Sequence, residues 1–261
     1  NDGKNDILIV YLDDSADVQK TFLRMFSLTG KKEFVKYAEM LLDSSAASVY
    51  DMRCDTANKG SKSFKRLFVS CLKTDSTMFT ELVYWDPDSL SLSRVFDDPS
   101  FSALTAANVT CRDIDFDGYI EVPVIDKISG LPDDLSVTTD EKTYTFMLLR
   151  WLNCIGDKSK REIVSFYNPV DSYILLFPWK DDVTVKYDRS TATTKFCSWS
   201  SFNSSVGDEL FSIHCVELDD LSGVSDKEQV LYKTSTHAFY FTISRYGESM
   251  GVSANSLISS F

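Results

Sequence analysis

Short runs in which apolar and polar residues alternate dominate this chain, and a period of two predicts β-strands rather than helices. In the run 90–96, for example, Leu90, Leu92 and Phe96 lie at alternate positions and share one face of a strand. Comparable runs occur at 7–11, 48–55, 65–71, 79–85, 119–125, 144–152, 162–167, 173–177, 183–187, 210–216 and 238–244. The pattern predicts a mainly β protein with antiparallel strands and little helix.

Residues 21–42 fit two interpretations. The apolar residues between Phe34 and Leu42 have helical spacing, which favours helices, whereas Thr29-Gly30 interrupts the stretch as a hairpin turn does. We favour two strands, because strands agree with an internal repeat. At the C-terminus, residues 253–261 predict one short helix capped by Ser253.

The internal repeat relates three strand-like segments. Matching Asp6, Arg66 and Glu121 aligns residues 5–11, 65–71 and 119–125, with spacings of about 60 and 55 residues, the length of one antiparallel blade. A cluster of Gly, Pro, Asp and Thr between Ser129 and Lys142 indicates a boundary. We therefore expect propeller-like blades in residues 1–129 and a β-rich C-terminal region in 130–261, either as two domains or as one assembly.

Composition narrows the classes of partner. The formal net charge is −12, which argues against nucleic acid and anionic membranes, because both would be repelled. No apolar run reaches the ~20 residues of a transmembrane helix. The chain begins at Asn1 without methionine, so we expect a processed or trimmed fragment.

Six cysteines would permit three disulfides, but their wide spacing contains no Cys-x-x-Cys pair and so predicts no zinc cluster. Because apolar or aromatic residues lie beside or near each of them, we favour buried free thiols. The cysteines are Cys54, Cys71, Cys111, Cys154, Cys197 and Cys215.

The segment 113–121 carries the most specific chemistry in the chain. It places aspartates at alternate positions, then Gly118 for a sharp turn and a fourth carboxylate three residues later. Ca²⁺ prefers six to eight oxygen ligands in flexible geometry, which such a turn can supply. The expected ligands are the carboxylates of Asp113, Asp115, Asp117 and Glu121 and the backbone carbonyl of Tyr119.

An EF-hand begins in the same way but requires a bidentate glutamate at the twelfth loop position and a helix on each side. Here the twelfth position is Val124, in a β-branched run that Pro123 interrupts. The loop instead resembles the D-x-D-x-D-G-x-x-D element of FG-GAP repeats in integrin-type β-propellers, with Glu121 in place of the final aspartate. That resemblance implies a calcium loop between two strands of a propeller.

The chain start resembles the second half of the same loop. There Asp2 and Asp6 flank Gly3-Lys4-Asn5 ahead of the strand-like segment 7–11. The resemblance implies that Asp2 and Asp6 are ligands of a truncated site. The middle copy lacks the acidic ladder beyond Asp55, and we expect it to bind no ion.

The order of parts is similar to uncharacterised secreted lipoproteins of Gram-positive anaerobes, with residues 165–179 as the relevant C-terminal segment. This resemblance implies an extracellular protein that a lipid anchor, upstream of this segment, attaches to the membrane. These lipoproteins have no assigned activity, so the resemblance implies none for this chain.

No catalytic signature stands out. The sequence contains no G-x-S-x-G, P-loop or G-x-G-x-x-G motif, and we interpret His214 and His237 as sheet residues rather than catalytic bases. We therefore expect a non-catalytic, calcium-stabilised surface protein whose partner is a protein or a polysaccharide. A purely structural cell-surface domain that binds only the ion is a further possibility.

The alternative is a carbohydrate-binding or glycoside-hydrolysing protein. It would need exposed tryptophans beside a cleft and, for hydrolysis, two carboxylates about 5–9 Å apart. The four tryptophans are Trp85, Trp151, Trp179 and Trp199.

Overall fold

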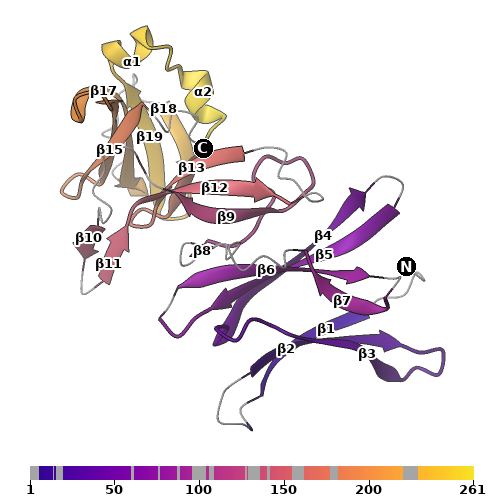
Figure 1. The fold of residues 1–261 in the computed structure, drawn as a ribbon. Coiled ribbons are helices and arrows are strands. Elements are labelled where there is room, and N and C mark those ends of the chain that lie inside the picture. Colours follow the sequence, from indigo (N-terminus) through magenta and orange to yellow (C-terminus); the bar gives the residue numbers. More distant parts are fainter. Residues whose placement is uncertain are drawn as a thin grey trace. The chain divides into compact units, whose positions relative to one another are not determined.

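The computed structural model describes residues 6–13, 15, 20–59, 62–75, 77–86, 89–95, 104–105, 109–126, 128, 136–139, 142–154, 162–176, 182–219 and 229–261. The chain forms two compact units, one of residues 1–125 and 151–162 and the other of residues 126–150 and 163–261. The predicted division after residue 129 stays a prediction. Figure 1 shows that strands make up most of both units, which confirms the mainly β, antiparallel fold.

The first unit begins with a three-stranded antiparallel sheet in the order β1-β2-β3. Its strands are β1 (Asp6–Asp13), β2 (Lys20–Leu28) and β3 (Phe34–Leu41). The strand interpretation of residues 21–42 is therefore confirmed. A turn joins β2 to β3, in which the Lys32 amide donates to the Thr29 carbonyl at 2.9 Å.

A second antiparallel sheet of the first unit has the order β4-β5-β6-β7, and the short β8 also pairs with β6. Its strands are β4 (Ser48–Lys59), β5 (Lys62–Leu72), β6 (Met78–Asp86), β7 (Ser91–Arg94) and β8 (Leu104–Thr105). Leu23 and Leu42 pack with Val69, Cys71 and Val83 of this sheet in one apolar core.

Four further strands pair in the order β14-β13-β12-β9. They are β9 (Glu121–Asp126), β12 (Met147–Asn153), β13 (Glu162–Asn168) and β14 (Tyr173–Leu176). Val122 of β9 packs with Phe68, Leu82, Cys111 and Cys154 in a small core of the first unit. Two members of this core, Cys111 and Val122, flank the predicted calcium loop in the sequence.

The second unit contains a five-stranded antiparallel sheet in the order β15-β16-β17-β19-β18 and the hairpin β10-β11. These strands are β10 (Ser136–Thr139), β11 (Lys142–Thr145), β15 (Val183–Asp188), β16 (Thr193–Ser200), β17 (Ser205–Glu217), β18 (Gln229–Lys233) and β19 (His237–Ile243). Its core is strongly aromatic, and the rings of Phe196 and Phe211 stack with centroids 4.4 Å apart. Whether the sheets of the two units are propeller blades stays a prediction.

Helix is confined to two short segments among the described residues, α1 (Arg245–Ser249) and α2 (Ala254–Ile258). The Ser253 hydroxyl accepts a hydrogen bond from the Ser256 amide, so the predicted capped C-terminal helix is confirmed. Within the described part of the chain, no helix is long and apolar enough to span a membrane.

The six cysteines are all free thiols, as expected. Four are buried, but Cys54 is exposed and Cys215 is half-buried, so the prediction of burial is wrong for these two. Cys54 lies in β4 opposite Leu67. Side chains of a strand alternate between the two faces of a sheet, and the Cys54 side chain lies on the exposed face.

Candidate metal centre

The acidic loop is a short connection closed by one antiparallel bridge. Arg112 and Glu121 face each other across it, and the Glu121 amide donates to the Arg112 carbonyl at 2.9 Å. Strand β9 begins at Glu121 and contains Val124, so a strand follows the loop where an EF-hand would have a helix. The exclusion of an EF-hand is confirmed.

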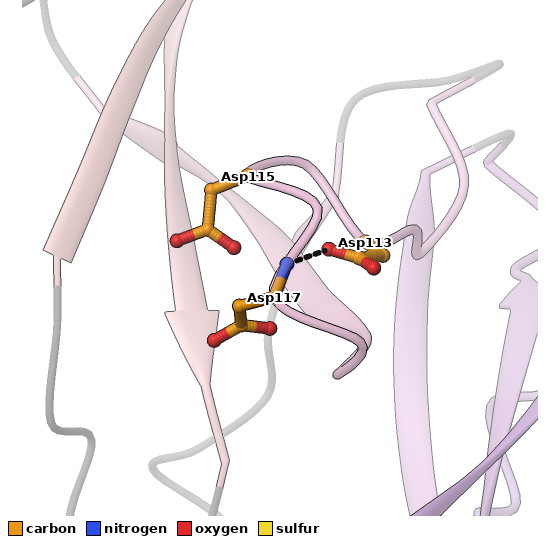
Figure 2. A group of neighbouring side chains, drawn as sticks. All are labelled: Asp113, Asp115 and Asp117. Atoms are coloured by element: carbon orange, nitrogen blue, oxygen red, sulfur yellow. Dashed lines mark hydrogen bonds between the residues drawn. The ribbon is translucent and has the colours of Figure 1, made fainter.

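Three carboxylates gather inside this loop. Asp113, Asp115 and Asp117 each place one oxygen so that the three atoms lie within 4.8 Å of one another. Figure 2 shows the three side chains on one loop, with the Asp113 carboxylate turned toward the backbone nitrogen of Asp117. Asp113 and Asp115 are half-buried and Asp117 is exposed, so the group is accessible to an ion from solvent.

Backbone amides hold two of these carboxylates in place. The two oxygens of Asp113 accept from the amides of Asp117, at 3.0 Å, and Gly118, at 2.9 Å. Asp117 Oδ1 accepts from the Tyr119 amide at 2.9 Å. A carboxylate oxygen has two lone pairs, so these bonds orient the oxygens and still leave a lone pair for a cation.

The loop backbone adopts left-handed conformations at two positions. Gly118 has φ +90°, which a residue without a Cβ adopts at little cost, and the predicted role of Gly118 in the turn is confirmed. Phe116 has φ +58°, which is uncommon for a bulky residue, and its side chain is 92% exposed. Both positions tighten the turn that brings the aspartates together.

Glu121 occupies a different environment from the three aspartates. It is fully buried, and it is not among the carboxylates grouped within 4.8 Å. Its Oε2 accepts from the Ile114 amide at 3.1 Å, and its Oε1 accepts from Asn153 Nδ2 at 3.0 Å. Glu121 therefore ties the start of the loop to β12, and its role as an ion ligand stays a prediction.

Burial is the main cause that raises the pKa of Glu121 to about 7. The negative charges of Asp117, Asp115 and Asp113 also raise this pKa, whereas the hydrogen bond from the Ile114 amide lowers it. A cation among the aspartates would offset these charges and favour the ionised form of Glu121. Proton release is therefore expected when an ion binds.

A buried ion pair supports the other end of the loop. Arg66 Nε donates to Asp55 Oδ1 at 2.8 Å, and Arg66 Nη2 donates to Asp55 Oδ2. Asp55 Oδ2 also accepts from the Ile120 amide at 2.9 Å, and Arg66 Nη1 donates to the Cys154 carbonyl at 2.5 Å. Both side chains are nearly inaccessible to solvent. The sequence did not predict this ion pair, although Arg66 is one of the three residues that align the repeat and Asp55 belongs to the middle copy of the loop.

The other predicted ligands are Asp6, Asp2 and Tyr119. Asp6 lies exposed at the start of β1, and Asp2 falls outside the described residues. Tyr119 is half-buried in the loop, and coordination by its carbonyl stays a prediction.

The arrangement offers only oxygen donors, all of them carboxylates. Such donors suit hard cations, of which Ca²⁺ is one. The residues therefore fit the predicted ion.

The residues proposed for other chemistry lie elsewhere. Trp151 is fully buried, Trp85 and Trp199 are half-buried, and Trp179 is outside the described residues. Because Trp85 and Trp199 are partly exposed, the carbohydrate alternative stays a prediction.

Both histidines lie in strands, as interpreted from the sequence. His214 Nδ1 lies 3.0 Å from Thr193 Oγ1, its Nε2 lies 3.0 Å from Ser212 Oγ, and its ring stacks on Tyr240. His237 is the first residue of β19, and its Nδ1 lies 2.8 Å from Thr236 Oγ1.

The sequence matches no protein-family model and no curated protein. The resemblance to FG-GAP repeats and to secreted lipoproteins therefore rests on the residues of the loop and of the strands alone, and it stays a prediction.

Proposed function

We propose that this chain is a non-catalytic extracellular protein whose propeller-like β-blades are stabilised by Ca²⁺ at the loop 113–121 and present a surface to a protein or polysaccharide partner. The observation that carries the proposal is the convergence of Asp113, Asp115 and Asp117 oxygens within 4.8 Å in a loop that runs directly into β9.

Electrostatics explains why this loop would bind a cation. Two unit charges about 5 Å apart repel by about 1 kcal/mol in water and by about 3 kcal/mol at an effective dielectric constant near 20. Three aspartates form three such pairs, and Glu121 adds a fourth carboxyl close by. A divalent cation replaces this repulsion with attraction, so ion binding stabilises the closed loop.

The role proposed for the ion is structural. The three grouped carboxylates come from one turn, and the same turn is bonded to β12 through Glu121 and to the β4–β5 hairpin through Asp55. With a dissociation constant of about 10⁻⁴ M, calcium at about 1 mM would add about 1.4 kcal/mol of stability.

The propeller part of the proposal is supported by the connectivity. An FG-GAP loop joins two strands of a blade, and here the loop is closed by the Arg112–Glu121 bridge and continues into β9. The preceding sheets of the first unit are antiparallel and contain three and five strands, counting β8 with the sheet of β4–β7. Lipid anchoring upstream follows from the resemblance to lipoproteins and belongs to the same proposal.

Thermal unfolding in calcium, in magnesium and in EDTA tests the ion site. We expect about 1 mM Ca²⁺ to raise Tm by about 3–6 °C over EDTA, and Mg²⁺ to raise it by less. Asp115→Asn should abolish the calcium shift, whereas Glu33→Gln, an exposed acid in another loop of the same unit, should leave it unchanged. Equal Tm values in calcium and EDTA would overturn the proposal, and so would a full calcium shift in Asp115→Asn.

A further inference from the structure

We propose that the solvent-facing side of the β1-β2-β3 sheet, called here the outer face, associates with the same face of a second copy of this chain. The register of the strands places its nine central positions in three rows. These rows are Ile7-Phe26-Lys36, Ile9-Arg24-Glu39 and Tyr11-Phe22-Leu41.

The two sides of this sheet differ in their surroundings. Leu8, Val10 and Leu23 point to the other side, where they pack in the core shared with the β4–β7 sheet. On the outer face, Ile7, Ile9 and Leu41 are 40%, 44% and 42% exposed. Six of the nine positions are apolar or aromatic, and contiguous exposed apolar surface of this kind marks an interaction site.

The charged residues of the outer face lie together in its centre and on one edge. Arg24 forms an ion pair with Glu39, Lys36 lies 3.6 Å from the same carboxylate, and the Arg24 guanidinium stacks over the Tyr11 ring at 4.0 Å. Two positive charges and one negative charge give the nine positions a net charge of +1, against −12 for the chain. The outer face is thus a region where two copies can meet without the repulsion that their overall charge causes.

The charge pattern is complementary to itself. Arg24 on β2 and Glu39 on β3 are direct cross-strand neighbours. A twofold axis parallel to the strands and between β2 and β3 exchanges these two strands, so each Arg24 faces the second copy's Glu39. The same axis places Phe22 against the second copy's Leu41, and Phe26 against the second copy's Lys36, whose aliphatic stem can cover the ring. The arrangement satisfies both pairs of charges and the Phe22–Leu41 contacts, and it leaves β1, with Ile7, Ile9 and Tyr11, at the rim of the interface.

The size of the outer face sets the expected strength. The proposed axis overlaps β2 and β3 of the two copies, and two strands about 4.8 Å apart with eight residues of about 3.3 Å each cover roughly 10 Å by 26 Å, or about 250 Å². A standard stable interface buries about 800 Å² per partner, so this one belongs to the weak class. We therefore expect a dimer that forms at high concentration, as on a crowded cell surface.

Sedimentation equilibrium of the whole chain, from about 10 µM to about 1 mM protein, tests the proposal. The weight-average mass should rise toward that of a dimer. It should rise further with added salt, because salt screens the repulsion between two copies of charge −12 more than it weakens a buried ion pair.

Charge-reversal variants test whether the outer face is the dimer interface. Arg24→Glu and Glu39→Arg should each weaken self-association at least about tenfold, since each places two like charges opposite each other across the interface. An equimolar mixture of the two variants should recover the dimer, because at positions 24 and 39 one copy then presents two acids and the other two bases. The mixture leaves the pair within each chain broken, so recovery cannot come from a repaired fold. Circular dichroism confirms that both variants remain folded.

Three results would overturn the proposal: a wild-type chain that stays monomeric at about 1 mM, a dimer that neither reversal weakens, and variants that do not associate when mixed. Binding of the monomer to neutral phosphatidylcholine vesicles, lost in Ile9→Lys, would also overturn it, by assigning the outer face to a lipid surface.

Discussion

Replacement of Arg66 by methionine should destabilise the first unit severely. Arg66 is 1% exposed, and its guanidinium makes two hydrogen bonds to Asp55 and one, of 2.5 Å, to the Cys154 carbonyl. Methionine has a similar length and is apolar, so Arg66→Met opens only a small cavity. It leaves the Asp55 carboxylate buried and without a cation, although its Oδ2 still accepts from the Ile120 amide.

The expected loss follows from the uncompensated charge. Removing one partner of a buried ion pair costs about 3–5 kcal/mol, because the remaining ion stays out of water. The lost bond to the Cys154 carbonyl adds about 1 kcal/mol. Since a domain is stable by only about 5–15 kcal/mol, Arg66→Met should bring the unit close to unfolding at room temperature.

The double variant Arg66→Met/Asp55→Asn is the matched control. An asparagine oxygen still accepts from the Ile120 amide, and no charge remains in the core. We expect the double variant to regain most of the stability that Arg66→Met loses, so that the effects of the two substitutions are strongly non-additive.

Urea unfolding in EDTA gives the free energies without any contribution from an ion. Hydrogen exchange of β4 and β5 peptides assigns the change to this unit, because the two units need not unfold together. The reasoning fails if Arg66→Met lies within about 0.5 kcal/mol of wild type. It also fails if the double variant is no more stable than the single one.

Three further predictions concern other parts of the chain. The pKa of Glu121 in the folded state, about 7, lies above its ordinary value, so the folded state binds this proton more tightly than the unfolded state does. The free energy of unfolding should therefore fall as pH rises from about 4.5 to 7, by at most about 1.4 kcal/mol per pH unit. Urea titrations in EDTA should show this slope in wild type and its loss in Glu121→Gln. Gly247→Ala should lower the free energy of unfolding, measured by thermal unfolding, by about 1–3 kcal/mol, because the new Cβ would lie 2.0 Å from the Leu210 carbonyl oxygen. Gly30→Ala, where no atom beyond the neighbouring residues lies within 4 Å of the new Cβ, should be near neutral, and equal effects of the two substitutions would contradict this reasoning. Ser253→Ala should cost about 1 kcal/mol and speed amide exchange in α2, and unchanged exchange would show that the cap is not needed.

The sequence predicted the strands in which apolar residues alternate with polar ones. It missed strands in which polar residues occupy buried positions. Strand β16 begins with Thr193 and Thr194, which are both buried, and Thr194 Oγ1 accepts from Asn168 Nδ2 at 3.0 Å. A buried hydroxyl that forms a hydrogen bond can occupy a core position. The start of β16 therefore lacks the alternation of apolar and polar residues that predicts a strand. Helix α1 was missed for a related reason, since Gly247 disfavours a helix but is required by the close approach to Leu210.

The candidate site divides in the same way between local and distant residues. The aspartate group could be predicted because its three carboxylates lie within five residues, and a turn must bring them together. The residues that hold this turn are 65 positions away at Asp55 and 32 positions away at Asn153, and neither carries a motif. Their importance comes from burial and hydrogen bonding, which a single sequence does not display.

Glu121 shows how burial changes the meaning of a residue that the sequence identified. By spacing alone it is one more carboxylate of an ion-binding loop, equivalent to the aspartates before it. In the fold it is the first residue of β9 and fully buried, and each of its two oxygens already accepts a hydrogen bond, one from the loop and one from β12. Asp55 does the same for Ile120 immediately before it, with Arg66 as its fixed cation. The loop is therefore anchored by two buried carboxylates, and the three aspartates are the carboxylates whose charge an ion would balance. An ion at this site would accordingly stabilise the connection between the strands, while the strands themselves are held by contacts that do not require it.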